Sequence, residues 1–287
     1  MTEKKKFEQP AITSESVESL SAKLLDATAK LAETNKELER LQKERSEMLA
    51  NLSHDLRAPL TAIRSTVDYL NSGKVLSPEE FQSAVQIIDR RTKTLEKLIQ
   101  DMYYLFCIED TSRELTLENV DAALFLEEYF YDATVDKRYD SHVMKLDIPE
   151  DLQCQISVDL QKMIRVLDNL MTNAAKYSGE HSTITLKASA RMSGSVSSLC
   201  ISVIDDGPGI PAEALPHIFN RTFTLSLART PDVDSGSGLG LSIVKAIVER
   251  HGGTISCNSI LGEGSCFTIS LPACLKRNIT EGKEKKK

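Results

Sequence analysis

One histidine lies among residues that suit nucleophilic chemistry. His54 occurs in the run SHDLRAPL (53–60), and it is the only histidine in the predicted helical half of the chain. A neutral imidazole is a competent nucleophile near neutral pH. The carboxylate of Asp55 could orient the ring or accept its proton, and Arg57 could contact a phosphate. Adjacent side chains on a helix do not face each other, so the Asp55 pairing needs a bent rotamer or a kink. The alternative is an ordinary exposed surface histidine.

Two asparagines form a second candidate site, in the run DNLMTNAAKYS (168–178). Asn169 and Asn173 are four residues apart and therefore share one helix face, and Lys176 and Tyr177 follow one turn later. Amide oxygens suit Mg²⁺, which usually shares its coordination shell with water and phosphates. Taken alone, such a pair is more often a solvated helix face.

Glycines mark a third region, because nine of the 13 lie between Gly207 and Gly264. Glycines gather where a backbone turns tightly or approaches a ligand closely. The run DDGPGI places Asp205 at the end of a predicted strand, where its carboxylate could accept a hydrogen bond from a ligand. The run GSGLGLSIV (236–244) places three glycines before a predicted helix, and its N–H groups favour a phosphate. It matches neither the Rossmann fingerprint nor a P-loop.

A long helix precedes these motifs and predicts a coiled coil over residues 20–50. Its heptad spacing puts an apolar seam on one side, with Lys, Glu, Asn and Gln between. The alternative is a solvated amphipathic helix that lies on its own domain. The a positions are Leu24, Leu31, Leu38 and Leu52, and the d positions are Ala27, Thr34, Leu41 and Met48.

The helix carrying the histidine should pass Pro59 with a kink, because proline removes a backbone hydrogen bond. A turn follows, and Ser77, Pro78 and Glu80 form the start of a second helix with a capping box. That helix should end near Phe106. One hairpin of two amphipathic helices cannot bury both apolar stripes, so we expect a twofold homodimer with a four-helix bundle. The second stripe comprises Phe81, Val85, Ile88, Leu95, Leu98, Met102 and Leu105.

The pattern changes after CIEDTSRELTLENV to strands and helices. The runs that read as strands are HVMKLDIPE, LQCQISVD, TITLKASA, LCISVIDD, GTISCNS and SCFTISLP. We expect the helical hairpin domain over 45–108 and a mixed α/β domain over 115–275. Residues 1–19 read as a flexible polar start, and 276–287 as a solvated charged tail. The fold class is therefore α plus α/β.

Composition limits the classes of partner. The 287 residues carry a net charge of −7, which argues against a nucleic-acid binder. No window approaches the roughly 18 apolar residues of a membrane span, and no signal peptide is expected. The six cysteines are scattered and read as reduced thiols, so the expected location is cytoplasmic.

Four motifs together resemble those of the sensor histidine kinases of two-component systems, in the family's order. SHDLRAPLTAI resembles the phosphoacceptor box and DNLMTNAAKYS the N box, while DDGPGI and GSGLGLSIVKAIVERHGG resemble the two glycine boxes. The resemblance covers roughly residues 45–273. It implies a dimeric four-helix bundle of helical hairpins, followed by a GHKL (Bergerat-type) α/β sandwich that binds ATP.

The resemblance also implies roles. His54 receives the γ-phosphoryl group of ATP, with Asp55 as acid/base partner and Arg57 in the same catalytic box. Asn173 holds Mg²⁺, and Asp205 accepts a hydrogen bond from the adenine amino group. The implied ATP-binding set is Asn169, Asn173, Lys176, Tyr177, Asp205, Gly207, Gly209, Ile210, Gly236, Gly238, Leu239, Gly240 and Leu241.

Two departures from the family pattern stand out. In the lid segment 216–230, Phe219 and Phe223 fit the phenylalanine box loosely, which leaves open whether Arg221 or Arg229 reaches the γ-phosphate. Ala58 stands where many members carry a Thr or Asn that positions a water for dephosphorylating the partner. We therefore expect weak phosphatase activity.

The expected function is an ATP-dependent protein-histidine kinase that autophosphorylates His54 and passes the phosphoryl group to an aspartate in the receiver domain of a response regulator. Expected partners are that regulator, a second copy of the chain and a separate sensor protein acting on the coiled coil, without nucleic acid or a membrane span. The alternative is a non-catalytic dimeric phosphotransfer adapter with a GHKL-like domain.

Overall fold

The computed structural model describes residues 14–110, 112–193, 196–221, 223 and 238–275. Most of the predicted flexible start, the charged tail, Gly236 and Arg229 lie outside the described residues. By its internal contacts the chain divides into two compact units, residues 1–54 and 55–287.

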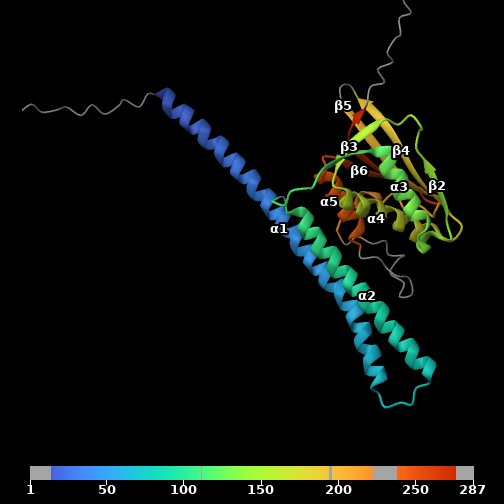
Figure 1. The fold of residues 1–287 in the computed structure, drawn as a ribbon. Coiled ribbons are helices and arrows are strands. Elements are labelled where there is room, and N and C mark those ends of the chain that lie inside the picture. Colours follow the sequence, from blue (N-terminus) through green and yellow to red (C-terminus); the bar gives the residue numbers. More distant parts are fainter. Residues whose placement is uncertain (1–13, 111, 194–195, 222, 224–237, 276–287) are drawn as a thin grey trace, which may run out of the picture. The chain divides into compact units, whose positions relative to one another are not determined.

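The first unit is the long N-terminal part of helix α1 (Ser14–Leu70) (Figure 1). The heptad leucines Leu24, Leu31 and Leu38 are all exposed. Charged side chains pair along the helix surface, as Lys30 does with Asp26 at 2.8 Å. Each helix of a coiled coil needs an exposed apolar seam, and these leucines give α1 such a seam. The coiled coil itself stays a prediction.

The second unit begins with residues 55–70 of α1, a short connection and helix α2 (Pro78–Glu109). Pro59 lies buried inside α1, which continues to Leu70. The predicted capping box at the start of α2 is confirmed, because the Glu80 N–H donates to Ser77 Oγ at 3.1 Å and the Ser77 N–H donates to the Glu80 carboxylate at 2.8 Å. Phe81 and Val85 of the predicted apolar stripe remain exposed in the single chain.

The ATP-binding fold expected from the sequence is built on a five-stranded sheet. Its strand order is β2-β4-β5-β7-β6, with β2 parallel to β4 and the other pairs antiparallel. Alternate residues of β4, Ile184, Leu186 and Ala188, are buried. The bounds are β2 Val143–Asp147, β4 Thr183–Ser193, β5 Val196–Asp205, β6 Thr254–Ile260 and β7 Gly264–Pro272.

Three helices pack on this sheet and complete the core (Figure 1). They are α3 (Ala122–Thr134), α4 (Leu160–Ser178) and α5 (Gly240–Arg250), with short 3₁₀ turns η1 (Lys137–Tyr139) and η2 (Leu215–His217). The layer of helices over a mixed sheet confirms the predicted α/β sandwich.

A second, three-stranded antiparallel sheet was not expected. It contains β1 (Glu118–Asp121), β3 (Cys154–Val158) and β8 (Cys274–Leu275), in the order β1-β3-β8. The sequence predicted β3 alone, because β1 and β8 are short and become strands only through their pairing with it. Within the described part of the chain, no helix is long and apolar enough to cross a membrane.

Candidate nucleotide-binding site

Helix α4 presents the two predicted asparagines from a firmly buried scaffold. Asp159 caps its N-terminus and accepts the Lys162 N–H at 3.2 Å. Asn169 and Asn173 are half-buried, and they lie beside the apolar side chains that α4 buries. The predicted shared face is therefore present on a helix that packing holds in place. The buried anchors are Met163, Val166, Leu167, Leu170, Met171 and Ala174.

The start of α5 lies against Asn169. The Asn169 Nδ2 group donates to the Arg165 carbonyl at 2.9 Å. A Cβ added to Gly240 would lie 3.0 Å from Asn169 Oδ1, so a larger residue at position 240 would need the Asn169 amide to shift. The residue at the N-cap is Leu239, whose side chain carries no polar atom that could cap the helix. The first N–H groups and the partial positive charge of α5 therefore suit a phosphate beside Asn169.

Asp205 ends strand β5 as a buried carboxylate, 8% exposed. Burial raises its pKa, and hydrogen bonds from the N–H groups of Gly207 and Ser265 oppose that rise. The Gly207 N–H lies 3.0 Å from Asp205 Oδ1. A carboxylate fixed in this way at a strand end can accept one further hydrogen bond, as recognition of an adenine amino group requires.

The loop after Asp205 is held by its glycines. Gly209 has φ +71°, and a Cβ there would lie 2.1 Å from the Ile260 carbonyl oxygen. The next N–H, of Ile210, donates to Ser259 Oγ at 2.8 Å. Glycine at 209 therefore serves close packing on the β6–β7 turn, in addition to the implied passage of the chain beside a base.

The remaining predicted nucleotide residues fall on these elements. Lys176 Nζ lies 5.2 Å from the ring centroid of Tyr177, at the end of α4. Gly238, with φ +65°, and the buried Leu239 precede α5, and Leu241 lies in its first turn. The described members of the predicted set therefore come from the C-terminal half of α4, the end of β5 with the loop after it, and the start of α5.

Asn173 fits the implied Mg²⁺ ion by the chemistry of its donor. Among the described residues, no group of three or more His, Cys, Asp or Glu side chains could hold a metal. An amide oxygen on a half-buried helix face suits an ion that takes most of its ligands from water and phosphates. Asn173 would hold such an ion together with the nucleotide.

His54 is exposed on α1, as a phosphoryl acceptor must be. Arg57 and Ala58 are also exposed, and Asp55 is half-buried. His54 closes the first compact unit and Asp55 opens the second.

Of the two predicted lid residues, Arg221 is described. Its guanidinium pairs with the carboxylate of Glu109 at the end of α2. Phe219 stacks edge-on against Phe267, with centroids 6.4 Å apart, and Phe223 lies 6.1 Å from the His217 ring. The γ-phosphate contact of Arg221 stays a prediction.

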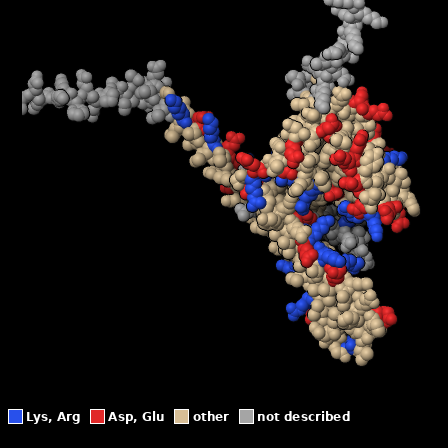
Figure 2. Space-filling model, viewed as in Figure 1, with Lys and Arg blue, Asp and Glu red and all other residues tan. Residues whose placement is uncertain are grey.

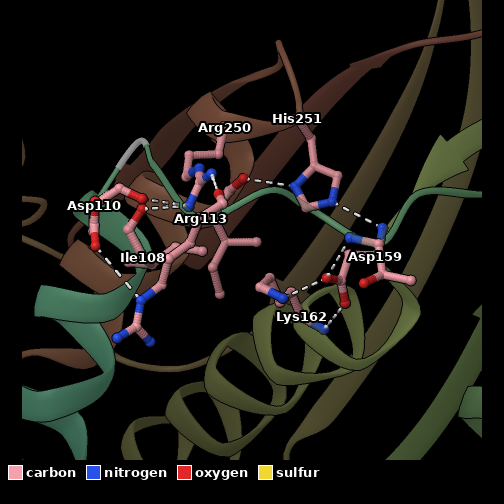
Figure 3. Close-up of polar contacts among 9 residues, drawn as sticks. Ile108, Asp110, Arg113, Asp159, Lys162, Arg250 and His251 are labelled. Carbon is pink, nitrogen blue, oxygen red and sulfur yellow. Dashed lines mark hydrogen bonds and ion pairs between the residues drawn. The ribbon is translucent and has the colours of Figure 1, made fainter.

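Sequence reasoning missed a polar cluster at the end of α2, shown in Figure 3. Arg250, the last residue of α5, donates through Nη1 to the carbonyls of Ile108 at 3.0 Å and Asp110 at 3.4 Å, and through Nη2 to that of Arg113. These carbonyls end α2 and begin the linker. A cation among such carbonyls satisfies acceptors that the helix itself leaves open.

The same close-up shows His251 joined to the start of α4 (Figure 3). Its Nε2 accepts the Asp159 N–H at 3.0 Å, and Nδ1 lies 2.7 Å from the Ile247 carbonyl. This arrangement needs the neutral ring with its proton on Nδ1. Burial lowers the pKa of His251 accordingly. An Asp before an apolar periodic run is a cap signal that could have identified Asp159.

A second missed contact joins α2 to α4. Arg165 pairs with Asp101 at 2.7 Å, and its guanidinium carbon lies 3.7 Å from the centroid of the Tyr104 ring. Asp101 is 8% exposed. Because both residues look like solvated helix charges in the sequence, only the fold reveals the pair.

Two family models match the chain. Residues 44–111 match the His Kinase A (phospho-acceptor) domain, and residues 158–274 match the histidine kinase-, DNA gyrase B- and HSP90-like ATPase. Sensor protein kinase WalK of Staphylococcus saprophyticus is 32% identical over 236 residues. That alignment covers 82% of this chain and 38% of the relative, so the chain spans well under half of the relative's length.

Two solved structures are similar in fold. The histidine kinase ThkA in complex with the response regulator protein TrrA has a TM-score of 0.62 at 25% identity, covering 85% of this chain and 66% of that chain. Full-length ShkA in complex with AMPPNP has a TM-score of 0.56 at 25% identity, covering 80% of this chain and 46% of that chain.

Proposed function

The chain belongs to the sensor histidine kinases, and from that premise we propose that it is an ATP-dependent protein-histidine kinase acting in two-component signalling. The observation that carries the proposal is a conjunction of two sites. An exposed His54 lies in the matched phospho-acceptor domain, and Asn169, Asn173 and Asp205 lie in the matched ATPase domain. The ShkA relative carries an ATP analogue, which supports ATP as the substrate here.

In the proposed binding mode, Asp205 accepts a hydrogen bond from the adenine amino group. The phosphates lie beside Asn169 and the start of α5. There, backbone N–H groups and the Asn169 amide stabilise the negative charge of the phosphates. A Mg²⁺ ion held at Asn173 would neutralise further charge on the phosphates when bound.

In the proposed reaction, an imidazole nitrogen of His54 attacks the γ-phosphorus in line. The new N–P bond forms as the bond to the bridging oxygen of ADP breaks. Asp55 accepts the imidazole proton. The phosphohistidine then passes its phosphoryl group to an aspartate of a response-regulator receiver domain, a partner class that the ThkA–TrrA complex supports.

We further propose that the chain acts as a homodimer in the cytoplasm. The exposed apolar side chains of Leu60, Phe81, Val85 and Ile99 would be buried between two hairpins in a four-helix bundle. The heptad seam predicted over residues 20–50, of which Leu24, Leu31 and Leu38 are exposed, would form the coiled coil on which a separate sensor protein acts. The adapter alternative is not favoured, because Asn173, Asp205 and Gly240 of the nucleotide site are all present.

The kinase proposal is tested by incubation with γ-labelled ATP and Mg²⁺. We expect protein-bound label that acid removes and alkali preserves, and we expect His54→Gln to lack it. Acid-stable label, or equal labelling of His54→Gln, would contradict the proposal.

Ala58 supports a finer proposal about dephosphorylation. Without the usual hydroxyl or amide three residues after Asp55, no side chain at this position can orient a water toward the regulator's phosphoaspartate. We predict that Ala58→Thr speeds loss of phosphate from a phosphorylated regulator about tenfold. Fast dephosphorylation by the unmodified protein would refute this, and Ala58→Ser serves as an intermediate control.

A further inference from the structure

A polar pocket of about 410 Å³, lined by four basic and three acidic side chains, lies between α2 and α4, next to the predicted phosphate site. From α4 it is lined by Asp168, Asn169 and Thr172, and from α2 by Lys93 and Lys97 among others. Figure 2 shows basic side chains gathered where the middle of α2 lies in Figure 1. The pocket reaches Asn169, so a phosphate chain that passes Asn169 can extend into it.

The walls of the pocket are fixed by contacts already described. The Asp101–Arg165 ion pair joins α2 to α4, with Tyr104 stacked on the guanidinium. The Arg165 carbonyl accepts from Asn169 at 2.9 Å. One residue therefore bonds both the α2 wall and the asparagine at the phosphate site, which holds the two at a set separation.

Among the described residues, three of the four basic side chains that line the pocket pair with carboxylates. Lys93 pairs with Asp89 at 2.7 Å, Arg138 pairs with Asp136 at 2.6 Å, and Arg165 pairs with Asp101. Lys97 is exposed, and it has no hydrogen bond or ion pair within the described part of the chain.

The acidic side chains that line the pocket also interact with neighbouring protein groups. Asp101 accepts from Arg165, and Asp168 accepts the Tyr129 hydroxyl at 3.0 Å. Glu96 acts electrostatically on Lys93. An anion entering the pocket would therefore meet Lys97 as its available partner.

We propose that Lys97 binds the terminal phosphate of ATP, so that α2 supplies part of the nucleotide site. This inference rests on the proposed kinase function, because the nucleotide must first lie at Asn169. ADP has no phosphate that reaches Lys97. The site then distinguishes ATP from ADP through a residue of the hairpin domain, and loss of the terminal phosphate releases that contact.

The test is calorimetric binding of ATP·Mg²⁺ and ADP·Mg²⁺ to the full chain in a His54→Gln background, which keeps the nucleotide intact. We expect Lys97→Gln to weaken ATP binding about fivefold, as for loss of one exposed ion pair, and to leave ADP binding unchanged. Lys97→Arg should retain the preference for ATP. Lys74→Gln, at an exposed lysine of the α1–α2 connection, is the matched control.

The outcomes separate this inference from the function on which it rests. Equal ATP affinity in Lys97→Gln and its parent, or equal losses for ATP and ADP, would overturn the role of Lys97 while leaving the kinase proposal standing. Failure of the folded parent protein to bind either nucleotide would overturn both.

Discussion

The helix that carries His54 and the helix that carries Asn169 and Asn173 differ most in what surrounds them. Every side chain of α1 from residue 21 to residue 40 is exposed, and ion pairs on such a surface contribute little to stability. Helix α4 buries six apolar side chains and is tied at its start to His251. Packing therefore holds in place the part of the proposed nucleotide site that α4 contributes. His54, the proposed acceptor, lies on the exposed surface of α1.

The largest effect that sharpens this comparison is expected at Gly209. Gly209→Ala should lower the free energy of unfolding by about 3 kcal/mol or more, because its Cβ would meet the Ile260 carbonyl at 2.1 Å and φ is +71°. Gly262→Ala is the matched control, since its φ of +88° adds strain but its Cβ meets nothing within 4 Å. It should lose about 1–2 kcal/mol. Urea unfolding measures both, and equal losses would show that the nucleotide loop is not held by packing.

A smaller effect is expected at Asp205, and it should separate binding from stability. Asp205→Asn should weaken ATP binding about tenfold, which corresponds to about 1.4 kcal/mol. Because burial raises the pKa of this carboxyl, its ionised form opposes folding, and that penalty grows as pH rises through the raised pKa. At pH 7 the variant should therefore be at least as stable as the parent. Calorimetry measures the ATP affinity, and urea unfolding measures the stability. A variant that is less stable yet binds ATP normally would make Asp205 a structural residue.

The smallest effect is a pH dependence at the start of α4. The pKa of His251 lies below 6.5 in the folded protein, so the unfolded chain binds more protons just below pH 6.5. The free energy of unfolding should fall as pH drops below 6.5, by at most about 1.4 kcal/mol per pH unit from this group. Protonation would remove the Nε2 acceptor from the Asp159 N–H. His251→Gln should flatten this part of a pH series of urea unfolding curves, and an unchanged slope would exclude His251 as its source.

The elements that position both sites could be predicted because local signals agree with the fold. Ser77, Pro78 and Glu80 start α2 as the capping box requires, and α4 shows its apolar periodicity in the sequence. Strand alternation identified β4 through β7 for the same reason. The residue types at Asn169, Asn173 and Asp205 pointed to a nucleotide site through the joint order of four motifs.

What the sequence could not predict depends on partners distant in the chain. Strand β1 has four residues, of which two are exposed and two are half-buried. It forms a strand only because it pairs with β3. Arg165 and Asp101 are 64 positions apart, and each looks like a solvated helix charge. Lys97 gave no signal for the same reason, since only the docking of α2 on α4 brings it to the pocket beside Asn169.

The separate roles proposed for His54 and for the nucleotide site are tested most directly by measuring nucleotide binding and phosphorylation on the same variant. We predict that His54→Gln binds ATP·Mg²⁺ with unchanged affinity and carries no acid-labile label, because the acceptor and the nucleotide site reside on separately built helices. Asp205→Asn should show the reverse pattern at limiting ATP, with an intact acceptor but weakened binding. Label retained on His54→Gln, or ATP binding lost with it, would contradict the assignment of His54 as the acceptor outside a preformed ATP site.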